Sequence, residues 1–239
     1  KENIFDILGM QYTDYLPTIQ QQDGKWINTV ACPWMDRIAP TEKQKDGSVL
    51  CGQVHDPLAR ILNGGISGNA GIFSNANDIG ILAAALLNGG EYNGRRILSP
   101  LGVKTMCTVP RELTAFGRTL GWDIFSPYAS NKGDLFSPNT FGHTGYTGTS
   151  IIIDPDNDTA VILLVNAVHP EDRHSIVRLR SLVANAVAAS ICPPAQVYTD
   201  HYYKRFLQFE TETPISPKDI VMVGNSLTEN GRNWSKRLN

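Results

Sequence analysis

The 239-residue sequence lacks several features that would point to whole classes of protein. No apolar run reaches the roughly 18 residues that a membrane-spanning helix needs. Lysine and arginine (21) nearly balance aspartate and glutamate (23), and no basic stripe stands out, so nothing in the charge pattern favours nucleic-acid binding. The four cysteines, Cys32, Cys51, Cys107 and Cys192, have neither metal-site nor redox-motif spacing, and their disulfide state stays open.

The sequence also lacks a metal-binding motif. The five histidines (55, 143, 169, 174 and 201) form no HExxH motif and no i,i+4 pair. "DPDNDTAVILLV" begins like a calcium loop, but Thr159 and Val165 stand where such a loop needs glycine and glutamate. The glycine-dense stretch 52–74 contains neither GxGxxG nor GK[ST], so it does not predict a phosphate site. We therefore expect no metal and no cofactor.

What the sequence does contain is an ordinary globular composition, with 41% hydrophobic and 18% charged residues. The apolar spacing of "NDIGILAAALLNGG" predicts a helix that Ser74 or Asn77 could cap and that Gly89-Gly90 end. Ser99 followed by Pro100 predicts the start of a second, short helix. Residues 1–60 are irregular and predict a loop region that covers the surface.

Farther along the chain the pattern changes to strands. Residues 120–125, 148–155 and 159–168 are rich in β-branched residues, and "DPDNDT" predicts a tight hairpin between the last two. A following amphipathic helix would place Ile176, Leu179, Val183 and Val187 on one face, from which it could cover the hairpin. These elements predict an α+β fold.

The two ends of the sequence are abrupt. The chain opens on "KENIFDILGM" with neither a start methionine nor a signal peptide, and we expect both ends to be truncations. Residues 193–219 are rich in proline and charge and predict a boundary with one short helix at 201–209. "IVMVGNSLTENG" then begins a new apolar strand.

The sharpest motif is "GHTGYTG". If it is a strand, His143, Gly145 and Thr147 share one face, while Thr144 and Tyr146 share the other. Glycine leaves room beside the strand, threonine offers a hydroxyl, and histidine offers a hydrogen bond or a switchable charge. An ordinary glycine-rich strand with a satisfied histidine explains the same residues, and the residues alone leave both interpretations open.

"GHTGYTGTSIIIDPDNDTAVILLVNAV" resembles the third conserved box and following hairpin of serine β-lactamases and penicillin-binding-protein-like hydrolases. It is most similar to the class C-like branch, with its esterases and D-alanyl-D-alanine carboxypeptidases, in which His-Thr-Gly replaces the commoner Lys-Thr-Gly. "ILGMQYTDY", "RIAPTE" and the stretch 52–90 follow in that family's order. The resemblance covers residues 1–192 and implies the C-terminal portion of a β-lactamase/DD-peptidase-like fold, an antiparallel sheet covered by helices.

The resemblance also implies roles for the residues of the box. His143 would anchor the substrate carboxylate and adjust the electrostatics of the site, and the hydroxyl of Thr144 would hydrogen-bond that carboxylate. Gly145 would leave space for the acyl chain, and the main-chain N–H of Tyr146 would contribute to an oxyanion hole.

The chain departs from the family pattern in two places. Asn69 stands in Gly68–Gly71 where family members often have histidine. The Ser-x-x-Lys and Tyr-x-Asn boxes would precede everything in this chain, and residues 1–192 contain no Ser-x-x-Lys. We therefore expect the chain alone not to form an acyl-enzyme.

Near the C-terminus, Gly224-Asn225-Ser226-Leu227 resembles the first block of SGNH (GDSL-like) esterases, with asparagine in place of aspartate. Ser226 would be the nucleophile there. The domain organisation predicted is a β-lactamase-like portion at 1–192, a linker at 193–217 and a truncated SGNH-like start at 218–239.

These resemblances imply a serine hydrolase that acts through an acyl-enzyme on peptidoglycan-type D-amino-acid peptides, β-lactams or small esters. The alternative is a non-catalytic module that binds peptide or glycan in the same groove. The family implies a periplasmic or extracellular location. A truncated domain would expose apolar surface, which predicts a homodimer or strand-swapped assembly.

Overall fold

The computed structural model describes residues 1–172 and 175–191. The chain divides after Ile191 into two units, Lys1–Ile191 and Cys192–Asn239. The predicted linker, the short helix at 201–209 and the SGNH-like segment with Ser226 all lie outside the described residues. The following description concerns the first unit.

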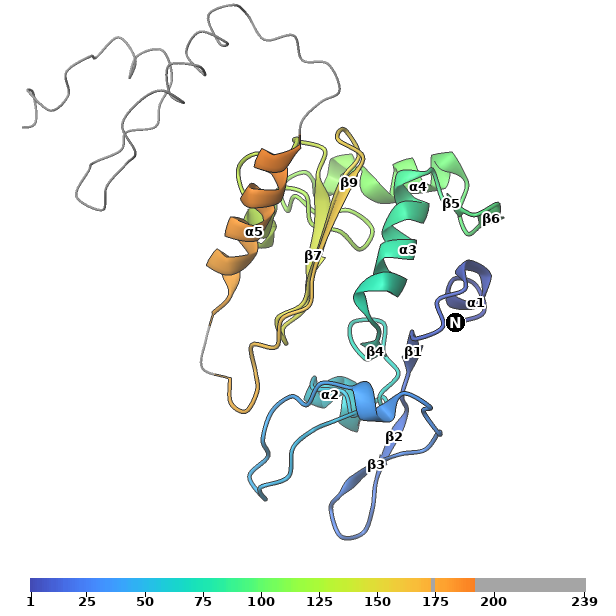
Figure 1. Ribbon diagram of the computed structural model, residues 1–239, viewed down its shortest axis with the longest axis vertical. Coiled ribbons are helices and arrows are strands. Elements are labelled where there is room, and N and C mark those ends of the chain that lie inside the picture. The colour runs from blue at the N-terminus through green and yellow to red at the C-terminus, as the bar shows by residue number, and fades with distance from the viewer. Residues whose placement is uncertain (173–174, 192–239) are drawn as a thin grey trace, which may run out of the picture. The chain divides into compact units, whose positions relative to one another are not determined.

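The centre of the first unit is a three-stranded antiparallel sheet in the order β7-β8-β9 (Figure 1). Strand β7 (Phe141–Thr144) pairs with β8 (Ser150–Asp154), which pairs with β9 (Thr159–Leu163). The predicted hairpin after Asp154 is confirmed, and Asp158 adopts a φ of 48° in its turn. The predicted strand 159–168 ends early, at Leu163.

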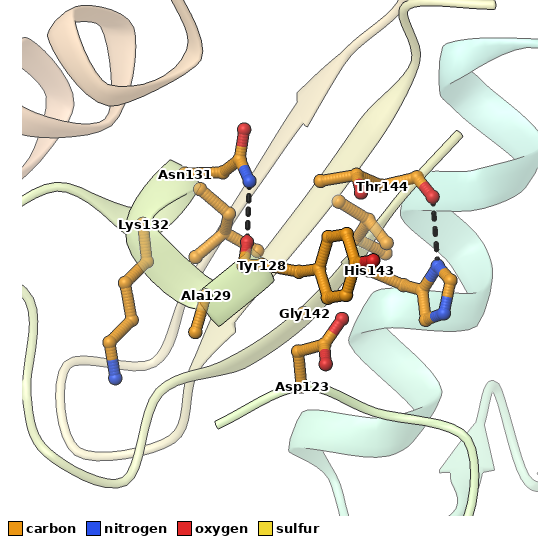
Figure 2. Close-up of a pocket in the computed structure, with 10 residues that line it drawn as sticks. Asp123, Tyr128, Ala129, Asn131, Lys132, Gly142, His143 and Thr144 are labelled. Carbon is orange, nitrogen blue, oxygen red and sulfur yellow. Dashed lines mark hydrogen bonds between the residues drawn. The ribbon is translucent and has the colours of Figure 1, made fainter. Parts of the chain in front are cut away.

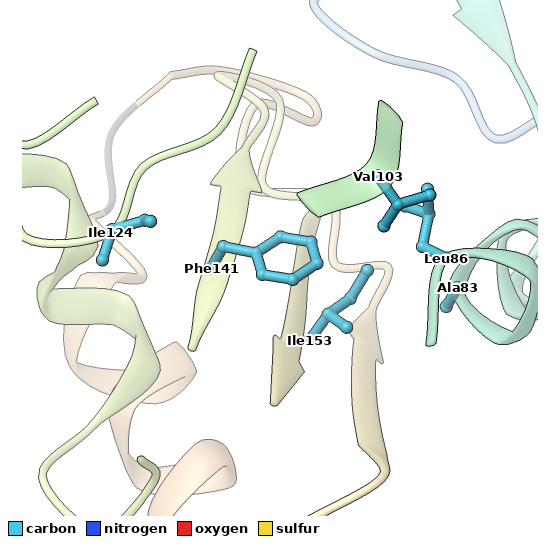
Figure 3. Packing of buried hydrophobic residues seen from close by; sticks show 6 residues of the cluster. All are labelled: Ala83, Leu86, Val103, Ile124, Phe141 and Ile153. Carbon is cyan, nitrogen blue, oxygen red and sulfur yellow. The ribbon is translucent and has the colours of Figure 1, made fainter. Parts of the chain in front are cut away.

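Helices cover both faces of this sheet, which explains the unbroken apolar run of β8. Ile153 is fully buried on the face that meets helices α3 (Ala76–Leu87) and α4 (Pro100–Cys107). Figure 3 shows this cluster, which comprises Ala83, Leu86, Val103, Ile124, Phe141 and Ile153. Ile152, one residue earlier, points to the opposite face and packs with Ala184 of helix α5 (Val177–Ser190). The α+β class is therefore confirmed.

The helix boundaries follow local signals, with one correction. Ser99 caps α4 as predicted, because its hydroxyl accepts a 3.0 Å hydrogen bond from Gly102 N. Helix α3 is capped by Asn75 and by neither Ser74 nor Asn77, since only the Asn75 side chain accepts from the N–H of Asp78.

The buried face of α5 also differs from the prediction. Val183 and Val187 pack on the sheet as expected, but Leu179 is 42% exposed. Arg180 and Ala184 are the buried residues of this helix. The hydrophobic periodicity of the sequence did not predict that Arg180, a charged residue, would be buried.

Residues 120–125 do not form the predicted strand. They form bends around an isolated bridge, in which Asp123 and Gly142 exchange both main-chain hydrogen bonds at 2.9 and 3.0 Å. The buried Asp123 carboxylate binds side chains of its own loop, so the segment folds locally instead of extending β7.

The first 73 residues contain only short elements, in keeping with the predicted loop region. Helices here are α1 (Phe5–Leu8), η1 (Met35–Arg37) and α2 (Pro57–Ile61). The strands are β1 (Asp14–Tyr15), β2 (Thr18–Gln20), β3 (Trp26–Asn28) and β4 (Ile72–Phe73). Beyond residue 73, the remaining short elements are β5 (Glu91–Tyr92), β6 (Arg95–Arg96), η2 (Arg111–Leu113) and η3 (Pro127–Lys132).

The buried carboxylate of Asp78 fastens the N-terminal segment to α3 by accepting hydrogen bonds from Tyr12 N and the Thr13 hydroxyl.

The described residues also settle three smaller points. None of their helices is both long and apolar enough to cross a membrane. Within the same residues, no group of three or more histidine, cysteine, aspartate or glutamate side chains could hold a metal ion. Cys32, Cys51 and Cys107 are free thiols, and Cys192 lies outside the described part of the chain.

Candidate active site

The box residues lie at the end of β7 and in the turn that follows it. Strand β7 stops at Thr144, and Gly145–Gly148 form a tight turn closed by Gly145 N to Thr149 O at 2.7 Å and Gly148 N to Gly145 O at 3.1 Å. The predicted alternation of faces therefore holds only as far as Thr144. Beyond it, turn geometry decides where each side chain points.

His143 and Thr144 project from this strand end beside a small cavity of about 20 Å³, room for about one water molecule (Figure 2). The His143 side chain is exposed, and its Nδ1 lies 2.9 Å from the Thr144 carbonyl oxygen. The hydroxyl of Thr144 has no hydrogen-bond partner within residues 1–172 and 175–191. The strand thus presents one free hydroxyl next to an accessible imidazole.

Gly145 and Tyr146 occupy the first two positions of the turn. A Cβ at residue 145 would come within 2.3 Å of the Thr149 hydroxyl oxygen, so the space that the glycine leaves is filled by this chain's own threonine. The Tyr146 N–H has no acceptor in the described part of the chain. The turn therefore leaves this main-chain N–H free to donate to another group.

A buried arginine holds this turn from behind. Arg180 of α5 is 7% exposed and donates from Nη2 to Gly145 O at 2.8 Å and to Thr149 O at 2.9 Å. Its Nη1 lies 3.4 Å from the side-chain oxygen of Asn131, and its Nε has no hydrogen-bond partner among the described residues. Burial lowers the pKa of Arg180. The guanidinium therefore places an uncompensated positive charge behind the box.

Beside the edge of β7 that does not pair with β8, an arginine and a serine hold a carboxylate. Asp123, which is 3% exposed, accepts from Arg118 Nε and from the Ser126 hydroxyl, both at 2.6 Å. Burial on its own would raise the pKa of Asp123, but these hydrogen bonds and the nearby positive charges lower it. Asp123 and Tyr128 line the cavity beside His143 (Figure 2).

Lys132 is the remaining cation of this cavity wall, and it points away from His143 (Figure 2). Its Nζ donates to Ile124 O at 2.9 Å, and burial lowers its pKa despite the opposing charge of Asp154. This lysine therefore ties η3 to the neighbouring loop and presents no free amine at the strand end.

Tyr146 has a second set of partners that the sequence did not reveal. Its ring stacks on that of His55 with the centroids 5.7 Å apart, and its hydroxyl donates to Asp172. The hydrogen bond to that carboxylate raises the pKa of Tyr146. The segments that contain His55 and Asp172 show no pairing signal in the sequence, because stacking between remote residues leaves no periodic pattern.

Three comparisons with known proteins bear on these residues. The sequence profile of the Beta-lactamase family matches residues 1–185. The chain belongs to the beta-lactamase family. A protein of Escherichia coli (strain K12) named "Putative D-alanyl-D-alanine carboxypeptidase" is 36% identical over 183 residues, which cover 71% of this chain and 39% of that protein. The chain thus spans well under half the length of the curated relatives that it matches.

A solved structure is similar in fold to this beta-lactamase family chain. Simvastatin Synthase (LovD) from Aspergillus terreus has a TM-score of 0.50 at 16% identity, covering 79% of this chain and 48% of that one. A beta-lactamase from Mycobacterium bovis has a TM-score of 0.41 at 24% identity over 51% of this chain and 46% of that one. Likeness at these identities concerns the fold alone.

Proposed function

We propose that the chain is part of a serine acyl-transfer hydrolase of the carboxypeptidase or esterase class. Its substrates would be peptidoglycan-type D-amino-acid peptides, β-lactams or small esters. The observation that carries the proposal is a pair of donors at the end of one edge strand, the Thr144 hydroxyl and the Tyr146 N–H, which have no partner in the part of the chain that the structure describes. Both lie in the segment that matches the family profile.

In this proposal the two donors have different tasks. The Thr144 hydroxyl, with His143 beside it, binds the carboxylate of the substrate and so positions the scissile carbonyl. The Tyr146 N–H donates to the oxyanion that forms when a serine attacks that carbonyl. Loss of one such donor costs about 10²–10³ in kcat in enzymes of this chemistry. Gly145 keeps its proposed role of leaving space for the acyl chain, which requires the Thr149 hydroxyl, 2.3 Å from a Cβ at residue 145, to turn aside.

The charges around the box favour an anionic substrate. Arg180 is buried behind the turn and has no carboxylate among its hydrogen-bond partners in the described residues. Because charge interactions are screened less inside a protein than in water, this cation favours a carboxylate at the strand end. The preference agrees with peptides that end in a free D-amino acid.

The nucleophile has to come from elsewhere in the protein. Residues 1–192 contain no Ser-x-x-Lys. We propose that segments outside this chain supply the serine and its general base, so that the 239-residue chain on its own forms no covalent adduct with a labelled penicillin. Labelling of any residue in 1–192 would contradict this assignment.

The proposal is tested in the full-length protein with a fluorescent penicillin, a D-Ala-D-Ala peptide and a small ester that lacks a carboxylate. Thr144→Val should lower kcat/KM for the peptide about 10- to 100-fold, since a hydrogen bond to a charged group contributes roughly 1.5–3 kcal/mol. The ester should lose much less. Thr147→Val, in the same turn, is the matched control and should behave as wild type. Equal turnover of the peptide by Thr144→Val would refute the role of the hydroxyl.

Binding of the peptide without any turnover or adduct in the full-length protein would instead favour a non-catalytic peptide- or glycan-binding module.

Three further assignments stay proposals. The boundaries at 1–192, 193–217 and 218–239, with Ser226 as the nucleophile of an SGNH-like domain, concern residues outside the described structure. The proposed periplasmic or extracellular location rests on membership of the family. The proposed dimer or strand-swapped assembly rests on the exposed apolar side chains of this unit, among them Leu62 and Leu101. Loss of ester turnover in Ser226→Ala would test the second nucleophile.

A further inference from the structure

The side chain of Tyr146 rests on a platform that comes from a distant part of the chain. The rings of His55 and Tyr146 are nearly parallel, at 20°, with their centroids 5.7 Å apart. The residue Tyr146 is 74% exposed, whereas the side chain of His55 is only 13% exposed. One face of an otherwise exposed ring is therefore placed against a fixed, shielded imidazole.

The imidazole is in turn oriented by one carboxylate. His55 Nε2 lies 3.3 Å from Glu42 Oε2, which is within ion-pair distance. The two atoms form no hydrogen bond, and this shielded nitrogen has no hydrogen-bond partner in the described residues. Glu42 is thus the polar group that can hold the plane of the ring.

Glu42 is itself in a segment that is fastened on both sides. The Asn166 side chain donates to Pro40 O, the His169 Nδ1 lies 2.8 Å from Thr41 O, and Lys43 N donates to Pro170 O at 2.8 Å. Hydrogen bonds on both sides of Glu42 therefore fix the backbone that carries its carboxylate.

Residues 166–172, which bind residues 40–43, also contact the turn of the box. Ala167 N donates to Thr147 O at 2.7 Å, and Asp172 accepts from the Tyr146 hydroxyl. A Cβ on Gly148 would come within 2.3 Å of Val165 O, so the two backbones lie in close contact. The contacts therefore form a closed circuit. Residues 40–43 contact His55, His55 stacks on Tyr146, Tyr146 binds the segment 166–172, and that segment binds residues 40–43.

We propose that His55, oriented by Glu42, is a positioning residue that fixes the ring of Tyr146 and thereby the direction of the Tyr146 N–H. The inference rests on the proposed function, because that N–H matters to catalysis only as an oxyanion donor. An oxyanion donor acts in the transition state and little in the ground state. Loss of the His55 ring beneath Tyr146 should consequently lower kcat and leave KM nearly unchanged.

The structural arm of the test measures hydrogen–deuterium exchange in the full-length protein, over peptides that contain the turn Gly145–Gly148. His55→Gln removes the flat ring and should speed exchange of the Gly145 and Gly148 amides about tenfold. His55→Phe restores a flat ring and should return exchange to near the wild-type rate. Leu62→Ala, at an exposed residue just beyond helix α2, is the control and should change nothing.

The kinetic arm uses the same variants on the peptide and ester substrates. We expect kcat about tenfold lower in His55→Gln with KM within twofold, and recovery to within threefold of wild type in His55→Phe. Glu42→Gln should lower kcat by about threefold, since the imidazole loses the carboxylate that orients it and keeps only its stack on Tyr146. His55→Gln that matches wild type in exchange and in kcat would overturn the proposal. So would His55→Phe that is as impaired as His55→Gln, because the flat ring would then not be what matters.

The two arms separate the two claims. If the wild-type protein turns over no acyl substrate, the proposed function fails, while the exchange data still decide whether His55 positions the turn. If turnover is normal and exchange does not respond to His55, only the positioning role fails.

Discussion

Replacing Arg180 by methionine tests the contribution of the buried cation that holds the box turn. Methionine keeps most of the length of the side chain and removes the guanidinium. The two short hydrogen bonds from Nη2 to Gly145 O and Thr149 O, at 2.8 and 2.9 Å, would be lost. Hydrogen bonds to a charged group contribute about 1.5–3 kcal/mol each, so the gross loss is roughly 3–6 kcal/mol.

Two effects reduce this loss. Both carbonyls keep one partner, because Gly148 N still donates to Gly145 O and Gly145 N still donates to Thr149 O. Removal of a buried cation whose Nε lacks a partner also recovers about 1–3 kcal/mol of desolvation. The net expectation is a free energy of unfolding that falls by about 1–3 kcal/mol in Arg180→Met.

Urea unfolding of the full-length protein, followed by circular dichroism, measures this difference. Arg178→Met is the matched control, since Arg178 is an exposed arginine on the same helix with no hydrogen bond or ion pair in the described residues, and it should stay within about 0.5 kcal/mol of wild type. An Arg180→Met variant as stable as wild type would refute the reasoning. It would mean that burying the charge costs as much as its hydrogen bonds contribute.

Three other predictions follow from buried groups. Asp154 is fully buried, and although burial raises its pKa, the hydrogen bonds from Ser137 and the following turn lower it below the ordinary value of about 3.9. The ionised carboxylate of Asp154 thus stabilises the folded protein above its ordinary pKa, and this stabilisation is lost as the pH falls through the lowered pKa of the folded state. Asp154→Asn should therefore flatten the acid limb of a curve of unfolding free energy against pH. Gly142→Ala places a Cβ 2.4 Å from Ile151 O and should cost about 1–3 kcal/mol in urea unfolding; an unchanged midpoint would contradict the strand packing. Burial raises the pKa of Cys107 to about 11, so iodoacetamide at pH 8 should label it at least a hundredfold more slowly in the folded protein than in urea, and equal rates would refute its burial.

Local patterns were enough to predict several elements. Ser99 before Pro100 fixes the start of α4, because a side-chain oxygen can satisfy the free N–H groups of a first turn wherever the helix lies. The turn after Asp154 likewise depends on residues that tolerate its backbone angles, among them Asp158. Such signals need only neighbours in sequence.

The same local reasoning failed where tertiary contacts compete. Residues 120–125 are apolar enough for a strand, but the Asp123 carboxylate binds Arg118 and Ser126 within its own loop. Leu179 satisfies the helical spacing of α5, yet it is exposed, while Arg180 is buried because carbonyl oxygens of the box turn lie beside it.

The sequence by itself determined the family, the α+β class, the central hairpin and the candidate box at residues 143–146, because each depends on residues adjacent in the chain. Only the tertiary structure decided what surrounds that box: the cation of Arg180 behind the turn, and His55 with Glu42 beneath Tyr146. A hydrogen bond or a ring stack between remote segments depends on their distance in space, and no periodicity along the chain records it.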